Sequence, residues 1–326
     1  MDSISLIVCI KNEEHALPHL LKSINPLPND EIVFVLDRCS DNSKNIIESY
    51  DLKCNKKIIE IEETNWPNAP KKYAVLQGVL NSSNNLLLFT DADCKLSQNH
   101  FAVNRVLFQI HDIIIGFCIP EKVPSTFLEK IQFVHFTWTA SLFSFFTKMK
   151  LPYMVMGANW GYHRNLFKQE LLQQHSDIKS GDDDLFFQSL LAENPKIVLN
   201  EITNVSTGYC EDWKALIRQK LRHLKAGVKY KLKFKIVLGL ISVFELLIFI
   251  SIIVSGIIHQ FQVSFYSLLI LIIYYNIVFN FTTAFLKRNK LNHLTRVSLI
   301  TFKPMHTLFI AILSVFSVFT NPKWKS

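Results

Sequence analysis

The N-terminal part of the chain alternates short apolar runs with stretches whose apolar residues recur at helical spacing. The runs predict strands over Ser5–Ile10, Glu31–Leu36, Lys57–Ile61 and Leu86–Thr90, and the stretches between them predict helices over Ala16–Ile24, Asn42–Tyr50 and Lys72–Leu80. Strands that alternate with helices are typical of an α/β domain with a mostly parallel sheet. In such domains, ligands bind at the carboxyl ends of the strands.

The C-terminal third contains three long apolar runs. Residues 236–258 and 263–285 are each long enough to cross a bilayer core of roughly 30 Å at about 1.5 Å per helical residue. The run over 304–320 is shorter, and it could span the membrane, re-enter it or lie in its interface. We therefore expect a catalytic domain over 1–230, followed by a membrane region over 236–326.

Charge is divided unevenly along the chain. Up to Asp212 there are 19 Lys and Arg against 26 Asp and Glu, whereas from Trp213 onward there are 16 against one acid, Glu245. The basic residues of the second part stand beside apolar runs, so anionic lipid is a better partner than nucleic acid. The hairpin over 259–262 has no Lys or Arg. In membrane proteins, the segments that flank the spans on the cytoplasmic side carry the excess of Lys and Arg. We therefore expect an integral membrane protein, in a bacterial inner membrane, whose N-terminal domain lies in the cytoplasm.

Other local patterns are consistent with this arrangement. Residues 213–230 predict a basic amphipathic helix at the membrane surface, and Phe133–Phe146 predicts either an interfacial helix or a core helix. The six cysteines show no metal-binding spacing, which favours reduced thiols in the cytosol. The N-terminus lacks the basic and long apolar segments of a signal peptide.

The sharpest candidate for chemistry is the pair of carboxylates in Asp91-Ala92-Asp93. The pair follows the strand LLLFT directly, and residues at i and i+2 point to the same side of an extended chain. Carboxylate oxygens at a strand end can hold Mg²⁺ or Mn²⁺ against a diphosphate. The alternative is a solvated turn, but the position after a buried strand favours the metal site.

Two further clusters surround the predicted strand ends and helix starts. Asp37 follows the second strand and can accept a hydrogen bond from a nucleoside, although it can equally belong to a helix cap. Lys71 and Lys72 begin a helix, where one of them can approach a phosphate or both can be solvated.

Acidic residues also precede the apolar run LFFQSLL. Asp182 or Asp183 can act as a general base, while three adjacent acids can also simply complement a helix dipole. On the basic helix that follows, Gln219 and Arg222 can face a departing diphosphate, or they can serve only membrane-surface electrostatics.

Taken in order, these motifs resemble family 2 glycosyltransferases of the GT-A fold. The resemblance is carried by SLIVCIKNEE, VLDRCSDNS, KKYAVLQGV, LLLFTDADC, MGANWGYHR, SGDDDLFF and RQKLRHLKAG, followed by membrane segments. It extends over residues 4 to 227 and implies a Rossmann-like, mostly parallel sheet. It also implies inverting transfer of a sugar from a nucleoside diphosphate, either UDP or GDP.

The resemblance implies a role for each matching residue. Lys11, Asn12, Glu13, Asp37, Lys72, Asp91, Gln219 and Arg222 would bind the nucleotide-sugar; Asp91 and Asp93 would hold the metal; Gly157, Ala158 and Asn159 would border the acceptor; and Asp182, with Asp183 as the close alternative, would be the base. Processive members of the family carry the motif Gln-x-x-Arg-Trp. Here Gln219 and Arg222 fit this motif, but His223 stands in place of the Trp. We therefore expect addition of a single sugar to a lipid-linked or membrane-proximal acceptor in cell-surface glycan synthesis.

Three alternatives differ in their products. A processive polysaccharide synthase would make long chains, a nucleotidyltransferase would release pyrophosphate, and a non-catalytic membrane scaffold would only bind nucleotide. The intact acidic residues in all three motifs argue against the scaffold.

Overall fold

The computed structural model describes residues 2–289, 291 and 296–320. The chain forms two compact units, which we call the sheet unit and the helical unit. The sheet unit holds the described residues of Met1–Lys122 and Phe146–Gly208, and the helical unit holds those of Val123–Phe145 and Tyr209–Thr320.

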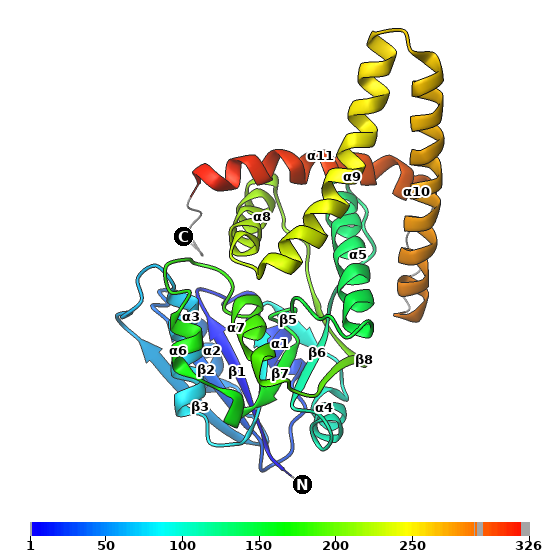
Figure 1. Ribbon diagram of the computed structural model, residues 1–326. Coiled ribbons are helices and arrows are strands. Elements are labelled where there is room, and N and C mark those ends of the chain that lie inside the picture. Colours follow the sequence, from blue (N-terminus) through cyan, green and yellow to red (C-terminus); the bar gives the residue numbers. More distant parts are fainter. Residues whose placement is uncertain (1, 290, 292–295, 321–326) are drawn as a thin grey trace. The chain divides into compact units, whose positions relative to one another are not determined.

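An eight-stranded mixed sheet forms the centre of the sheet unit, in the order β3-β2-β1-β4-β7-β6-β8-β5 (Figure 1). The strands are β1 (Ile4–Ile10), β2 (Glu31–Asp37), β3 (Asn55–Ile61), β4 (Leu86–Asp91), β5 (Cys94–Leu96), β6 (Ile113–Pro120), β7 (Trp160–His163) and β8 (Ile197–Thr207). The first four are parallel, whereas β7 runs antiparallel to both β4 and β6. The carboxyl ends of β1, β2 and β4 therefore meet at one edge, as the sequence predicts.

Helices connect these strands. They are α1 (Leu17–Ser23), α2 (Ser43–Ser49), α3 (Pro70–Asn81), α4 (His100–Phe108), α6 (Gln169–Gln173) and α7 (Asp184–Leu190), with 3-10 turns η1 (Arg164–Leu166) and η2 (Leu191–Glu193). Their packing explains why β1, β2 and β4 are apolar almost throughout, since strands covered by helices are buried on both faces.

The position of α3 matters most for the site because its first turn carries Lys71 and Lys72, one of which was expected to approach a phosphate. The helix packs on β1 and β2. An added Cβ on Gly78 would lie only 2.5 Å from Ile7 and 3.2 Å from Val35. The glycine thus permits the close approach that fixes the rotation of α3 over the sheet.

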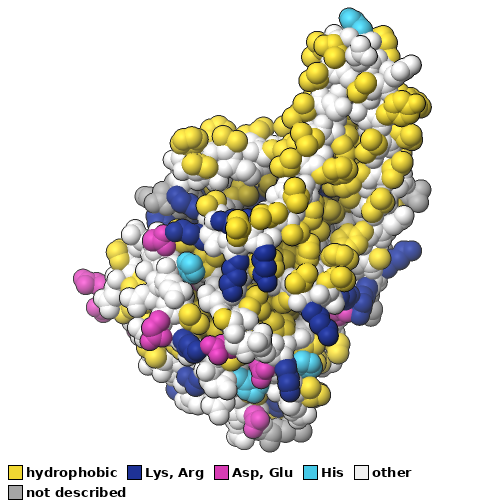
Figure 2. Space-filling view, viewed as in Figure 1, with side chains coloured by type: hydrophobic (Ala, Val, Ile, Leu, Met, Phe, Trp, Pro, Cys, Tyr) yellow, Lys and Arg dark blue, Asp and Glu magenta, His cyan; other side chains and the backbone are white. Residues whose placement is uncertain are grey.

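The helical unit contains the long apolar helices. It comprises α5 (Phe127–Lys148, which ends just inside the sheet unit), α8 (Trp213–Val228), α9 (Leu232–Ile257), α10 (Phe261–Arg288) and α11 (Arg296–Phe319). In the described chain, Leu232–Ile257, Phe261–Arg288 and Thr301–Phe319 are long and apolar enough to cross a membrane. Figure 1 shows α9 and α10 as an antiparallel hairpin with α11 running across its direction, and Figure 2 shows hydrophobic side chains covering the hairpin surface.

The predicted fold class is confirmed: an α/β unit is joined to a helical region with candidate membrane spans. The proposed boundary at residue 230 stays a prediction. Phe133–Phe146, for which the sequence left two possibilities, lies on α5, and most of this segment belongs to the helical unit.

Candidate active site

Two loops at the carboxyl ends of β1 and β2 are fastened to each other by hydrogen bonds. The Ser40 amide donates to Asn12 Oδ1 at 2.8 Å, and the Glu13 amide donates to Ser43 Oγ at 3.0 Å. The Lys11 ammonium donates to the Arg38 carbonyl at 2.5 Å. The structure therefore brings the predicted segment over 11–13 against the loop that follows Asp37.

Asp37 is fully buried at the end of β2, where Arg38 binds both of its oxygens. Arg38 Nε lies 2.7 Å from Asp37 Oδ1, and Nη2 lies 2.9 Å from Oδ2. This bidentate pair raises the pKa of the Arg38 guanidinium. Asp37 thus orients the half-exposed side chain of Arg38 at the loop surface. The position of Asp37 in the sequence did not predict this role.

The carboxylates of Asp91 and Asp93 lie in the turn between β4 and β5. Ligand atoms of Asp91, Asp93 and Cys94 all lie within 4.8 Å of one another. Asp91 ends the central strand, and β5 pairs with β8, so the turn is held from both sides. Two oxygen ligands at this spacing fit a hard divalent cation.

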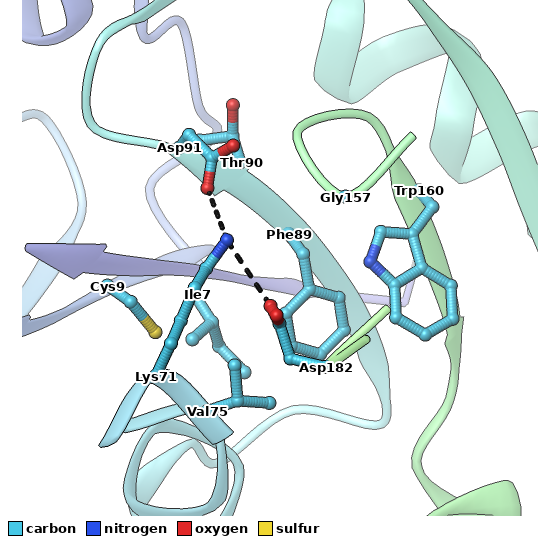
Figure 3. Close-up of a pocket in the computed structure, with 10 residues that line it drawn as sticks. All are labelled: Ile7, Cys9, Lys71, Val75, Phe89, Thr90, Asp91, Gly157, Trp160 and Asp182. Carbon is cyan, nitrogen blue, oxygen red and sulfur yellow. Dashed lines mark hydrogen bonds and ion pairs between the residues drawn. The ribbon is translucent and has the colours of Figure 1, made fainter. Parts of the chain in front are cut away.

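Lys71 lies between two carboxylates that are distant in sequence (Figure 3). Its ammonium is 2.9 Å from Asp91 Oδ1 and 3.2 Å from Asp182 Oδ2. Although burial acts in the opposite direction, Asp182 and Asp91 raise the pKa of Lys71 above its usual range, which favours its charged form. The three side chains line a pocket together with Gly157 and Trp160.

Lys72, which the sequence analysis placed in the nucleotide site, points elsewhere. Its side chain is 1% exposed, and its ammonium donates to the carbonyls of Ile178 at 2.7 Å and Ser180 at 2.6 Å. Burial lowers its pKa to about 8. Lys72 therefore holds the segment that leads into Asp182, while its neighbour Lys71 lines the pocket.

The three consecutive acids at the start of α7 have different surroundings. Burial opposes ionisation of Asp182, but Lys71 and Lys72 lower its pKa below the usual range. Burial and the neighbouring Asp182 raise the pKa of Asp183 to about 6. Asp183 Oδ1 accepts from the Asp184 amide at 2.7 Å, and Asp184 Oδ1 accepts from the Val155 amide at 2.9 Å. Of the three, Asp182 is the carboxylate that lines the pocket.

The segment Gly157-Ala158-Asn159 contributes one residue to the pocket and two to the interior. A Cβ on Gly157 would collide with the carboxylate of Asp183, so only glycine fits there without a shift. Ala158 belongs to the core, and Asn159 is buried with its amide donating to the Phe117 carbonyl at 2.8 Å.

Gln219 and Arg222 lie on α8 in the helical unit. Their role at the diphosphate stays a prediction. Cys9, Thr90 and Trp160 also line the pocket and were not among the residues predicted from the sequence. The signal for Trp160 was present, since it stands in the quoted segment MGANWGYHR.

Residues 5–171 match the profile described as glycosyl transferase family 2. No curated protein matches the chain. Among solved structures, the mannosyltransferase PcManGT from Pyrobaculum calidifontis, in complex with GDP-Man and Mn²⁺, shares 12% identity and a TM-score of 0.56, over 96% of this chain and 87% of that one. The predicted GT-A fold is thereby confirmed.

TarS from S. aureus, in complex with UDP-GlcNAc, shares 18% identity and a TM-score of 0.45, over 69% of this chain and 66% of that one. The present chain spans 65% and 39% of the lengths of two further TarS structures.

Proposed function

The chain belongs to glycosyltransferase family 2, and we propose that it transfers a sugar, with inversion, from a nucleoside diphosphate to a hydroxyl of a lipid-linked or membrane-proximal acceptor. The observation that carries this proposal is the group formed by Asp91, Lys71 and Asp182 in one pocket. In this group, Asp91 is a carboxylate that can bind a cation, Lys71 supplies a positive charge, and Asp182 can act as a base.

The residues at the end of β4 fit a divalent cation. Asp91 and Asp93 would hold it, since two carboxylates with ligand atoms close together are the hard oxygen ligands that Mg²⁺ and Mn²⁺ prefer. When bound, such an ion would offset negative charge on the diphosphate. PcManGT was solved with GDP-Man and Mn²⁺, which supports the same choice here.

We assign the base to Asp182. It lines the pocket, and the lysines beside it keep its carboxylate ionised at neutral pH. The acceptor oxygen forms a bond to the anomeric carbon, the bond from that carbon to the diphosphate oxygen breaks, and the electron pair leaves with the nucleoside diphosphate. The acceptor proton passes to the Asp182 carboxylate. Asp183 is engaged with the first turn of α7 and is the second candidate.

The remaining predicted residues surround this reaction. Lys11, Asn12 and Glu13, with the loop ordered by Asp37, would bind the nucleoside, and Gln219 and Arg222 would contact the diphosphate. His223, where processive relatives have Trp, favours one addition per acceptor. The basic ends of the apolar helices support a cytoplasmic sheet unit.

The test is a panel of UDP- and GDP-sugars supplied to the full chain in detergent with membrane lipids and Mn²⁺. We expect metal-dependent release of nucleoside diphosphate, with kcat lower by about 10²- to 10⁴-fold in Asp182→Asn, the usual contribution of a general base. Asp51→Asn is the matched control because it makes the same change on an exposed residue.

Three results would contradict the proposal. Full transfer by folded Asp182→Asn and Asp93→Asn variants would remove the assigned residues from the reaction. Release of pyrophosphate would indicate a nucleotidyltransferase, and long products would indicate a processive synthase.

A further inference from the structure

Basic side chains of α5, α8 and α11 lie close together inside the helical unit. Figure 1 shows the backbone of α11 running across α5 and α8. His135 of α5 and His306 of α11 are hydrogen-bonded to each other, with His135 Nδ1 and His306 Nε2 2.8 Å apart. Lys220 and His223 of α8 and Lys303 of α11 also act electrostatically on His135. We call these five residues the basic cluster.

Glu245 is the acid that pairs with this cluster, and it forms an ion pair with one member, Lys303. Glu245 Oε2 lies 2.5 Å from the Lys303 ammonium, and Glu245 Oε1 accepts from the Tyr275 hydroxyl at 3.0 Å. Lys303 also lies 4.8 Å from the centre of the Trp138 ring. The charge of Glu245 is therefore matched locally and does not offset the rest of the cluster.

Lys220 has no such partner. Its side chain is 8% exposed, and within the described part of the chain its ammonium makes neither a hydrogen bond nor an ion pair. Burial lowers its pKa to about 8, so it is still mainly protonated at neutral pH. Nearby, His306 Nδ1 is buried and also lacks a hydrogen-bond partner among the described residues.

This arrangement is unfavourable without an anion. A buried charge is costly unless it is paired, and a buried polar nitrogen is costly unless it is hydrogen-bonded. Burial, and to a smaller extent the four neighbouring basic residues, lower the pKa of His135 well below its usual range, so His135 itself is neutral. A small anion between Lys220 and the histidines would relieve both costs.

We propose that Lys220, His306 and His135 form a binding site for a phosphate group carried by a membrane amphiphile. Lysine is a frequent phosphate ligand. When His135 Nδ1–H donates to His306 Nε2, His306 Nδ1–H is left to donate to the phosphate, so His135 orients His306. The amphiphile is favoured over free phosphate because the cluster lies in the unit that carries the long apolar helices. A lipid headgroup presents its phosphate where apolar chains and basic side chains meet.

The test measures binding of short-chain phosphatidic acid to the full chain in a neutral detergent by calorimetry. No nucleotide-sugar is present, so the outcome is independent of the proposed transfer reaction. We expect saturable binding by the native chain. Lys220→Met should weaken it by about tenfold to a hundredfold, the usual effect of losing a hydrogen bond to a charged group.

Lys214→Met is the matched control because it makes the same substitution on the same helix at an exposed position. It should stay within about twofold of the native affinity, as expected for a screened surface charge. Lys220→Arg, which keeps the charge, should retain more affinity than Lys220→Met. The circular dichroism spectrum and the thermal unfolding transition in the same detergent report whether each variant is folded.

Three outcomes would overturn the proposal. One is absence of saturable binding by the native chain, and another is equal weakening by Lys214→Met and Lys220→Met. The third is inorganic phosphate binding as tightly as phosphatidic acid, which would assign the site to free phosphate rather than to an amphiphile.

Discussion

Replacing Lys71 with methionine removes the cation between Asp91 and Asp182. Methionine has a similar length and no charge, so the pocket should keep its shape. The proposed base then loses the nearest group that stabilises its ionised form. The pKa of Asp182 should rise, and the enzyme should need a higher pH to reach full activity.

The size of the effect follows from the distances. The Lys71 ammonium is 3.2 Å from Asp182 Oδ2, and the Asp182 side chain is 10% exposed, so water screens the pair weakly. A cation at such a distance lowers a carboxyl pKa by about 1–3 units. Lys72 also lowers the pKa of Asp182 and stays in place, so we expect a rise in the lower part of that range.

The assay is the pH dependence of kcat/KM for sugar transfer, which reports groups of the free enzyme. The acidic limb of the profile should move upward by about 1–2 units in Lys71→Met. It should stay in place in Lys71→Arg, which keeps the charge, and in Lys44→Met, which removes a half-exposed lysine that pairs with Glu60. If the limb of Lys71→Met coincides with that of the native enzyme, Lys71 does not control the base.

Three further predictions concern metal, loop and helix packing. Chelation should abolish transfer, Mn²⁺ or Mg²⁺ should restore it, and Asp93→Asn should raise the metal concentration needed for half-maximal activity. Lys72→Met should lower the free energy of unfolding by about 1–3 kcal/mol in denaturant titrations, because the buried carbonyl of Ile178 and the half-buried carbonyl of Ser180 lose their donor. Glu245→Gln should destabilise the chain in detergent by about 3–5 kcal/mol, because it leaves a buried ammonium unpaired. Adding Lys303→Met to Glu245→Gln should recover much of the loss in thermal stability.

The strand ends were predictable because their signal is local. Each apolar run that ends in polar residues predicts a buried strand with its loop at the sheet edge, and parallel strands gather those loops together. Asp37 and Asp91 were identified in this way. The strands β5 to β8 were not predicted, because their partners lie far away in the sequence: β8 pairs with β6 and also with β5, the latter across more than a hundred residues.

The choice between Lys71 and Lys72 could not be made from the sequence. Neighbouring helical residues point about 100° apart, so only one of the two faces a given pocket. Which one does so depends on the rotation of α3, and Gly78 sets that rotation by its contact with β1 at the other end of the helix. The polar residue Asn159 was equally ambiguous, because a buried amide that joins strands and an exposed one that meets substrate look alike in sequence.

The basic excess of the C-terminal part does more than attract lipid. Lys214 is exposed on α8 and suits a general electrostatic role at a membrane surface. Lys220, six residues further along the same helix, is buried, and Lys303 forms an ion pair with Glu245, the one acid from Trp213 onward. Surface attraction does not require burying a lysine, and burial without a partner is unfavourable. The buried fraction of the charge is therefore better explained by a specific anion than by the bilayer as a whole.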